Sequence, residues 1–355
     1  MSTRPNHGRG WAEINLANLV ANARAVLAAQ PGARLLPMVK ADAYGLGAVP
    51  CARALRATSL WGFGVASLQE AAELRAAGFS EPILVFTPAD VADLPFVRDL
   101  DVRVVLDRPE TVRRWDRPFH LEIDTGMSRC GVGWDDGAAL AACRSPHLEG
   151  VFTHLHSADV RPETVVGQWE RFVAAREAIG PRPPLVHVAN SAGAWRVPEV
   201  LDLARPGIYL YGGEVAQDIP APAPVLALRA PVVSLRRVRA GESVSYGAEW
   251  VAPADTTIAT LGIGYADGVP RTIQDRASVL LGGRRLPVVG RVTMDFVMVD
   301  TGDGAGIALG DDATLIGGAH GDTITLDAFA GWAGTIAYDV IARLGRRLER
   351  RYPSA

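Results

Sequence analysis

The chain has 355 residues, 48% of them hydrophobic and 21% charged, and its formal net charge at pH 7 is −3. This composition is typical of a globular protein, and the charge balance argues against a broadly basic nucleic-acid-binding surface. Because no long apolar run is present and the first ten residues are polar, we expect neither a membrane span nor a secretory signal. Three cysteines at irregular spacing indicate a reducing cytoplasm rather than a disulfide framework or a metal site.

Short apolar runs alternate with helix-like stretches through the first part of the chain. We expect helices at Gly47–Ala57, Gln69–Ala77 and Pro162–Ile179. Strands separated by helices at this spacing indicate parallel βαβ units, and about eight such units suit a closed (β/α)8 barrel of the TIM type better than an open sheet. The predicted strands are Arg34–Lys40, Trp61–Ala66, Pro82–Phe86, Val102–Leu106, Phe119–Asp124, Leu148–His154, Leu185–Ala189 and Leu201–Arg205.

The pattern changes at the proline-rich segment 220–224, which is typical of a linker. Short β-like runs with frequent turns follow, and a terminal helix is expected over Tyr338–Arg350. We therefore predict an α/β protein with a barrel over residues 1–225 and a mostly antiparallel β domain over residues 226–355. The expected strands of the second domain are Ala230–Leu235, Thr257–Ile263, Ala277–Leu281, Val288–Val292, Val297–Asp300 and Ala313–Ile316.

Lysine is almost absent from the sequence. Of the 36 lysine and arginine residues only Lys40 is a lysine, so arginine serves wherever a positive charge alone is needed. An amine can lose its proton and attack a carbonyl group, whereas a guanidinium cannot. Lys40 is therefore either a chance survivor of a biased composition or a residue whose chemistry requires a primary amine.

Polar residues follow the predicted barrel strands at their carboxyl ends, where barrel enzymes place their active sites. Loops after the last strands of a barrel often bind phosphate through backbone N–H groups. A phosphate-bearing aldehyde held by a lysine fits this set of residues, and pyridoxal 5′-phosphate is such a cofactor. The strand-end residues are Lys40, Glu122, Asp124, His154, His156, Asn190, Ser191, Arg205, Gly207 and Ile208.

Sequence blocks along nearly the whole chain resemble those of one enzyme family. The segment PMVKADAYGLGA around Lys40 resembles the cofactor-lysine motif of alanine racemases, which are fold type III pyridoxal-phosphate enzymes. The resemblance implies a (β/α)8 barrel, a C-terminal β domain and a head-to-tail homodimer in which both chains build each active site. The further blocks, in the family's own order, are DTGMSR, THLHSAD, HVANSAGA, RPGIYLYG, VSYGAEW, IGYADGVPR and VGRVTMDFVMVD.

The resemblance assigns the cofactor-binding residues by motif. It implies that Lys40 bonds covalently to the aldehyde, that Arg205 contacts the pyridine nitrogen, and that His154 lies by the ring or joins the network of Arg205. Without the motif, the tyrosines and the histidine would be read as core residues and the serine and glycine as an ordinary turn. The residues implied to hold the phosphate are Tyr44, Ser191, Tyr338 and the backbone of Gly207 and Ile208.

An arginine at the pyridine nitrogen has a chemical consequence. A guanidinium with a pKa above about 12 does not give up its proton, so the ring nitrogen stays unprotonated and the ring is a weaker electron sink. Transamination and decarboxylation are thereby disfavoured. A decarboxylase of the same fold type would be expected to place an acidic residue where Arg205 stands.

Racemisation removes a proton from one face of an α-carbon and returns one on the opposite face, so it needs two acid–base groups. The resemblance gives these roles to Lys40 and to Tyr246, the latter delivered from the partner subunit. Tyrosine ordinarily titrates near pH ~10, so its use as a base requires a site that stabilises its anion. The residues implied to contact the substrate or line its entrance are Arg129, Tyr265, Asp295 and Met294, the last through its backbone.

The chain departs from the family pattern at three positions. Many members carry a carbamylated lysine two residues before the aspartate of DTGM, where it orients the arginine that matches Arg129; here that position is Glu122. Glu122 is either an encoded substitute that acts on Arg129 through water or a backbone shift, or an exposed glutamate with no such role. Cys130 stands where leucine is common and is interpreted as a small apolar filler, and Phe296 would alter the substrate pocket.

The sequence therefore predicts a cytoplasmic isomerase that interconverts L- and D-alanine and supplies D-alanine for peptidoglycan. A racemase of broader or different specificity, such as one acting on serine, is the nearest alternative. A non-catalytic pyridoxal-phosphate-binding protein with the same barrel would lack residues 226–355. The expected partners are a small amino acid and a second copy of the chain, with no nucleic acid, membrane or metal.

Overall fold

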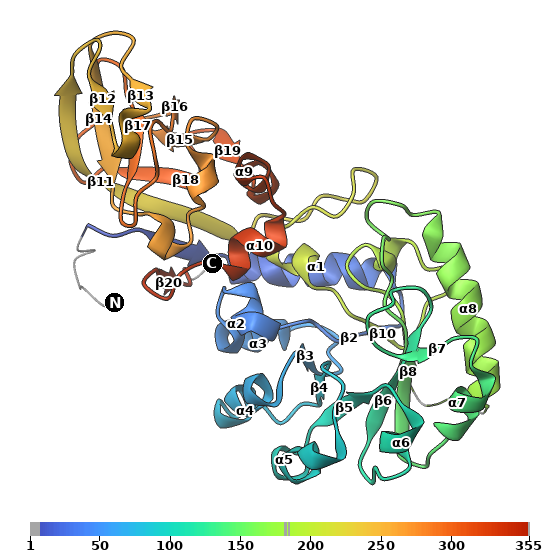
Figure 1. Ribbon diagram of the computed structural model, residues 1–355. Helices are drawn as coiled ribbons and strands as arrows, with labels where there is room; N and C mark the ends of the chain where they lie inside the picture. Colours follow the sequence, from blue (N-terminus) through green and yellow to red (C-terminus); the bar gives the residue numbers. More distant parts are fainter. Residues whose placement is uncertain (1–7, 181–182, 184, 354–355) are drawn as a thin grey trace. The chain divides into compact units, whose positions relative to one another are not determined.

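The computed structural model describes residues 8–180, 183 and 185–353 (Figure 1). The first of its two units runs from Leu19 to Ala223, and the second combines residues up to Asn18 with those from Pro224 onward. The sequence predicts that the barrel includes the whole N-terminal segment. The structure differs there, because β1 (Trp11–Ile14) hydrogen-bonds to β11 (Leu226–Val238) and so extends the sheet of the second unit.

Parallel strands form a closed ring in the first unit. The strands are β2 (Arg34–Leu35), β3 (Phe63–Val65), β4 (Ile83–Val85), β5 (Arg103–Leu106), β6 (Phe119–Asp124), β8 (Leu148–Phe152), β9 (Leu185–His187) and β10 (Leu203–Ala204), with β7 (Val132–Gly133) beside β6. Their order is β3-β4-β5-β6-β8-β9, and β10 pairs with β2. Backbone hydrogen bonds close the ring, from Gly64 N to Pro37 O over 2.9 Å and from Arg205 N to Ala189 O over 2.8 Å. The predicted barrel is confirmed.

Helices connect the strands, and α4, α5, α7 and α8 lie outside the ring in Figure 1. Their bounds are α1 (Leu16–Ala29), α2 (Lys40–Tyr44), α3 (Ala48–Leu55), α4 (Leu68–Ala76), α5 (Leu94–Leu100), α6 (Pro109–Val112), α7 (Gly137–Ala142) and α8 (Thr164–Ile179), with 3₁₀ turns η1 (Val91–Asp93), η2 (Gly193–Trp195) and η3 (Ile208–Tyr211). The helices expected from the sequence at 47–57, 69–77 and 162–179 are α3, α4 and α8. Among the described residues, no helix combines the length and the apolar character needed to cross a bilayer.

Apolar side chains fill the interior of the ring. They come from different strands or strand ends, they contact one another, and each is at most 8% exposed. A filled barrel leaves its chemistry to the rim at the carboxyl ends of the strands. These residues are Leu36, Trp61, Leu84, Val105, Phe152, Leu185 and Leu203.

The second unit is a mostly antiparallel sheet, as predicted. Its main order is β16-β15-β18-β11-β1-β20, with β14 beside β11 and β17 beside β14. The elements not yet bounded are β12 (Ser243–Val244), β13 (Trp250–Val251), β14 (Thr256–Leu261), β15 (Ser278–Leu281), β16 (Arg284–Pro287), β17 (Val297–Asp300), β18 (Asp312–Ala319), β19 (Asp322–Ile324), β20 (Glu349–Arg351), α9 (Leu326–Ala333), α10 (Ala337–Ala342), η4 (Tyr246–Ala248), η5 (Tyr265–Asp267) and η6 (Arg271–Ile273).

Two predicted elements of this unit are wrong. The terminal helix ends at Ala342, and the chain then turns at Gly345, whose amide donates to Asp267 O over 2.8 Å. A β-carbon at Gly345 would lie 2.6 Å from Ala266 O, so this close approach requires glycine. The chain then forms β20, which pairs in parallel with β1. The strand expected at Val288–Val292 is replaced by β16, and only Val288 forms an isolated bridge there.

Candidate active site

Lys40 is followed by a turn in the left-handed backbone conformation. Residues 41–44 have φ values between 51° and 55°, so four residues other than glycine lie in the left-handed region. Each such residue costs roughly 1–2 kcal/mol relative to the right-handed helix. The Glu70 carboxylate on α4 offsets part of this cost, because it accepts from Ala41 N and Ala66 N, both over 2.7 Å. Asp42 accepts from Ala48 N over 2.6 Å and joins the turn to α3.

The Lys40 amine lies in an environment that favours its neutral form. Burial lowers the pKa of the amine, the positive charge of Arg129 lowers it further, and Glu70 acts in the opposite direction. A less basic amine is more often unprotonated and thus available to attack a carbonyl group or to accept a proton. The position that the sequence marks by its lone lysine is therefore also electrostatically suited to nucleophilic and base chemistry.

Four of the residues predicted to hold a phosphate come together at the rim. The Ser191 hydroxyl accepts from Gly207 N over 2.9 Å and from Tyr209 N over 3.4 Å. A β-carbon at position 207 would lie 2.3 Å from the Tyr44 hydroxyl, so only glycine allows Tyr44 to approach this backbone. Ile208 is the first residue of η3. Hydroxyl and backbone N–H groups gathered at one point are donors suited to phosphate oxygens.

Arg205 is fixed by buried acceptors and keeps one donor available. Its NH1 group donates to His187 Nδ1 and to His187 O over 2.8 and 2.7 Å, and its NH2 group donates to Thr153 O over 2.9 Å. None of the described residues accepts from its Nε. Burial lowers the pKa of the Arg205 guanidinium to about 10, so it remains a cation near neutral pH. A rigid cation with an open N–H fits an unprotonated ring nitrogen.

Behind Arg205 lies a chain of two buried histidines and the partly buried Glu149, which the sequence does not predict. Because Arg205 only donates, His187 Nδ1 accepts and its Nε2 carries the proton, which points to His120 Nδ1 at 2.7 Å. His120 Nε2 then faces Glu149 Oε2 at 3.5 Å. Burial lowers the pKa of both imidazoles and keeps them neutral. A single histidine within an apolar strand run, as in FHLEID and LVHVA, was the available signal.

His154 is placed near these groups but not within their hydrogen bonds. Burial and the charges of Arg205, Arg129 and Lys40 lower the pKa of its imidazole to about 3. His154 is therefore neutral at physiological pH. The resemblance implies that His154 either lies by the cofactor ring or joins the network of Arg205. In the structure Arg205 donates to His187, and no hydrogen bond links it to His154 among the described residues.

Glu122 is buried in the barrel and is not the exposed glutamate that one reading of the sequence allowed. Its exposed fraction is 4%. Among the described residues none forms a hydrogen bond or an ion pair with its carboxylate, and Arg129 is exposed at the rim. Burial raises the pKa of Glu122, while Arg129 and Arg205 oppose that shift through longer-range attraction.

Cys130 is a free, partly buried cysteine.

The remaining predicted residues belong to the second unit and are unusually exposed for apolar and aromatic side chains. Tyr246 is 71% exposed and opens η4, where Ser245 and Ala248 have φ values of 69° and 50°. Large exposed side chains in one unit are typical of surfaces that another molecule covers. The others are Tyr265 at 44%, Met294 at 51%, Phe296 at 41% and Tyr338 at 38% exposed.

Comparison with known proteins agrees with this arrangement. Residues 14–215 match the family model described as alanine racemase, N-terminal domain, and residues 225–352 match alanine racemase, C-terminal domain. The chain belongs to the alanine racemase family. The alanine racemase of Symbiobacterium thermophilum is 40% identical to this chain, over 96% of each.

Solved alanine racemases share the whole fold. The enzyme from E. faecalis matches with a TM-score of 0.90 and 33% identity, over 98% of this chain and 99% of that one. The enzyme from Bartonella henselae, solved with covalently bound pyridoxal phosphate, matches with a TM-score of 0.88 and 28% identity, over 97% of this chain and 99% of that one. Membership of the family thus covers both units of the chain.

Proposed function

We propose that this member of the family interconverts L- and D-alanine with pyridoxal 5′-phosphate, using Lys40 and Tyr246 as its two bases. One observation carries the proposal: the only lysine of the chain opens a strained turn at the barrel rim, and burial lowers the pKa of its amine. When bound, the cofactor withdraws electrons from the substrate α-carbon and makes its hydrogen removable.

The residues of the first unit fit this cofactor. Lys40 would supply the amine that bonds to the aldehyde, and Tyr44, Ser191 and the backbone of Gly207 and Ile208 would surround the phosphate. Arg205 would offer its Nε–H to the ring nitrogen without giving up a proton, since its guanidinium pKa of about 10 lies well above neutral pH. Proton return to the α-carbon is then favoured over transamination.

Two bases on opposite faces of the α-carbon account for inversion. The Lys40 amine moves the proton on one face, and the Tyr246 hydroxyl, from the partner subunit of a homodimer, moves it on the other. The 71% exposure of Tyr246 within its own chain supports this assignment. Arg129 and the backbone of Met294 would bind the substrate carboxylate, Tyr265 and Asp295 would line the entrance, and Tyr338 would add a phosphate contact. The setting we propose is a bacterial cytoplasm, where D-alanine serves peptidoglycan synthesis.

Incubating the holoenzyme with L-alanine and L-serine separately, and quantifying the D-isomers by chiral chromatography, tests the proposal. We expect rapid formation of D-alanine, and borohydride reduction should fix the cofactor on the Lys40 peptide. Faster conversion of serine than of alanine would identify a larger amino acid as the preferred substrate, and Phe296 would be the first pocket residue to test. An adduct on Lys40 without any racemisation would reject the reaction while leaving the cofactor in place.

Glu122 is proposed to replace the carbamylated lysine of other family members by acting on Arg129 through water. The variant Glu122→Gln keeps the side-chain size and removes the charge, so Arg129 loses a distant anion. We expect KM for L-alanine to rise roughly three- to tenfold with little loss of stability, because the interaction is longer-range and the carboxylate is already costly to bury. Steady-state kinetics and thermal melting measure both effects.

The exposed Glu110 on α6 provides the matched control, and Glu110→Gln should leave KM unchanged. Removing bicarbonate should not affect the wild type, whereas a Glu122→Lys variant should gain activity when bicarbonate is added. An unchanged KM in Glu122→Gln would contradict the role proposed for this carboxylate.

A further inference from the structure

The turn formed by residues 293–296 has every carbonyl oxygen engaged. Thr293 O accepts from Tyr265 N over 3.0 Å, and Met294 O accepts from Ala266 N over 3.1 Å. Asp295 O accepts from Arg9 NH1 over 3.0 Å, and Phe296 O accepts from Thr293 N over 2.9 Å. Each carbonyl oxygen of the turn thus already has a donor within the protein, and Phe296 O finds its donor inside the turn itself.

Two of the backbone N–H groups of this turn, unlike its carbonyl oxygens, have no hydrogen-bond partner among the described residues. Among the described residues, no acceptor is found for the amides of Met294 and Asp295, and Met294 is 51% exposed. Each carbonyl shares a peptide plane with the next N–H, so bonds accepted by Thr293 O and Met294 O make these two amides stronger donors. Successive unpaired N–H groups of this kind bind anions. The Met294 amide is therefore a ready donor for a carboxylate.

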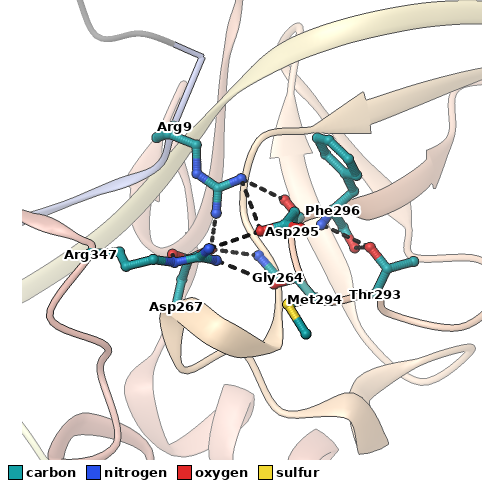
Figure 2. A network of polar contacts seen from close by, with 8 residues as sticks. All are labelled: Arg9, Gly264, Asp267, Thr293, Met294, Asp295, Phe296 and Arg347. Atoms are coloured by element: carbon teal, nitrogen blue, oxygen red, sulfur yellow. Dashed lines mark hydrogen bonds and ion pairs between the residues drawn. The ribbon is translucent and has the colours of Figure 1, made fainter.

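A network of two arginines and two aspartates surrounds this turn (Figure 2). Its centre is Asp267, which is 1% exposed. One of its carboxylate oxygens accepts from Arg9 NH2 over 2.5 Å and from Gly264 N over 2.9 Å, and the other accepts from Arg347 Nε over 3.0 Å. One buried carboxylate thus fixes two guanidinium groups that come from opposite ends of the chain.

Both guanidinium groups extend from Asp267 to the turn. Arg347 NH1 contacts Asp295 Oδ1 over 2.9 Å, and its NH2 donates to Met294 O over 3.4 Å. Arg9 NH1 donates to the Asp295 carbonyl oxygen over 3.0 Å (Figure 2). A planar guanidinium holds several acceptors in a fixed geometry, which a lysine ammonium does not. Asp267 and Asp295 also raise the pKa of Arg347 and keep it charged.

Gly264 completes the support beneath the turn. A β-carbon at this position would lie 2.4 Å from Thr293 O and 2.5 Å from Met294 O. The turn therefore rests directly on the backbone that precedes η5, and Asp267 N donates back to Gly264 O over 3.0 Å. Movement of Asp267 would shift the turn and the Tyr265 segment together.

We propose that Arg9, Asp267 and Arg347 are positioning residues that aim the Met294 amide at the substrate carboxylate. This inference rests on the proposed function, in which the Met294 backbone binds that carboxylate. The three residues do not touch the substrate themselves. They hold the carbonyl oxygens of Met294 and Asp295, and so fix the turn in which the Met294 and Asp295 amides have no acceptor among the described residues.

The test uses the holoenzyme and its Arg347→Gln and Arg347→Lys variants. Arg347 is preferred to the buried Asp267 because its side chain is 45% exposed, so its replacement should leave the fold intact. Arg285→Gln is the matched control, since Arg285 forms a two-point pair with Asp322, at 2.9 and 2.7 Å, on β16 and β19 of the same unit. The measurements are KM and kcat for L-alanine, the dissociation constant of propionate by calorimetry, and the thermal midpoint.

We expect Arg347→Gln to raise both KM and the propionate dissociation constant about tenfold, with kcat within about twofold of the wild type, because one hydrogen bond to a charged group is misaligned. Arg347→Lys should recover part of the loss, and Arg285→Gln should change neither constant. A lower thermal midpoint with unchanged constants would overturn the positioning role and leave a structural one. If the wild type failed to racemise alanine, the proposed function would fail, and propionate binding alone would still decide whether the network positions a carboxylate site.

Discussion

Racemisation is expected to fall by about 10²–10⁴-fold in both directions when Tyr246 is replaced by phenylalanine, which is the range attributed to one general acid–base group. The ring remains, but the hydroxyl that would move a proton on one face of the α-carbon is gone. Lys40 still serves the opposite face. Exchange of the α-hydrogen with deuterated solvent should therefore persist for one enantiomer without inversion. Chiral chromatography with mass spectrometry separates exchange from inversion.

Val251→Ala is the control for this experiment, because Val251 is a 49% exposed neighbour on β13 with no acid–base chemistry. Its activity should match that of the wild type. The visible absorbance of the cofactor should be the same in Tyr246→Phe and in the wild type, since Tyr246 is not among the residues proposed to hold it. Equal loss of exchange for both enantiomers would contradict a two-base assignment and point to a general disturbance of the site.

Loss of the Lys40 amine should be the most severe single change. Lys40→Arg keeps the positive charge and much of the length, yet a guanidinium neither bonds to the aldehyde nor accepts a proton at neutral pH. Two roles disappear together, so activity should fall by at least about 10⁴-fold. After borohydride reduction, peptide mapping should find the cofactor on Lys40 in the wild type and on no side chain of the variant.

The N-terminal amine is the one other primary amine that the cofactor could label, because the sequence has no second lysine. The amount of adduct found in the Lys40→Arg variant therefore measures this nonspecific labelling directly. In Lys40→Ala, a small added amine such as methylamine should restore part of the turnover by replacing the missing base. Retained activity in Lys40→Arg would show that the charge of this residue matters and its amine does not.

The barrel could be predicted because its strands are buried on both sides. A strand such as Ile83–Val85 is wholly apolar and is bounded by helix and turn signals, so its type and place follow from the sequence. The pairing of β1 with β11 and β20 could not be predicted, since it joins segments more than 200 residues apart. The end of α10 also depends on a distant contact, the approach of Gly345 to the Asp267 backbone.

In the candidate active site, too, local sequence predicts some features, whereas others depend on contacts between distant segments. Residues that end strands, such as Lys40, Ser191 and Arg205, lie at the rim because parallel strands place their carboxyl ends together. His187 has only a weak local signal, a single histidine in an apolar strand run, and Glu149 has none, because its link to Arg205 passes through His120 and His187. The left-handed turn after Lys40 was also missed, since alanine and tyrosine give no signal for positive φ; the structure finds its support in Glu70, from the next βα unit.

The handedness of the Lys40 turn bears on the order in which the barrel assembles. A run of L-residues does not hold positive φ values by itself, and the Glu70 carboxylate that braces Ala41 and Ala66 is in place only once α4 has docked beside β3. We therefore expect the Lys40 side chain to take its final orientation only after the following βα unit has docked. A nascent chain that ends before Glu70 carries Lys40 but lacks the carboxylate that braces its turn, and we expect such a chain to bind the cofactor poorly.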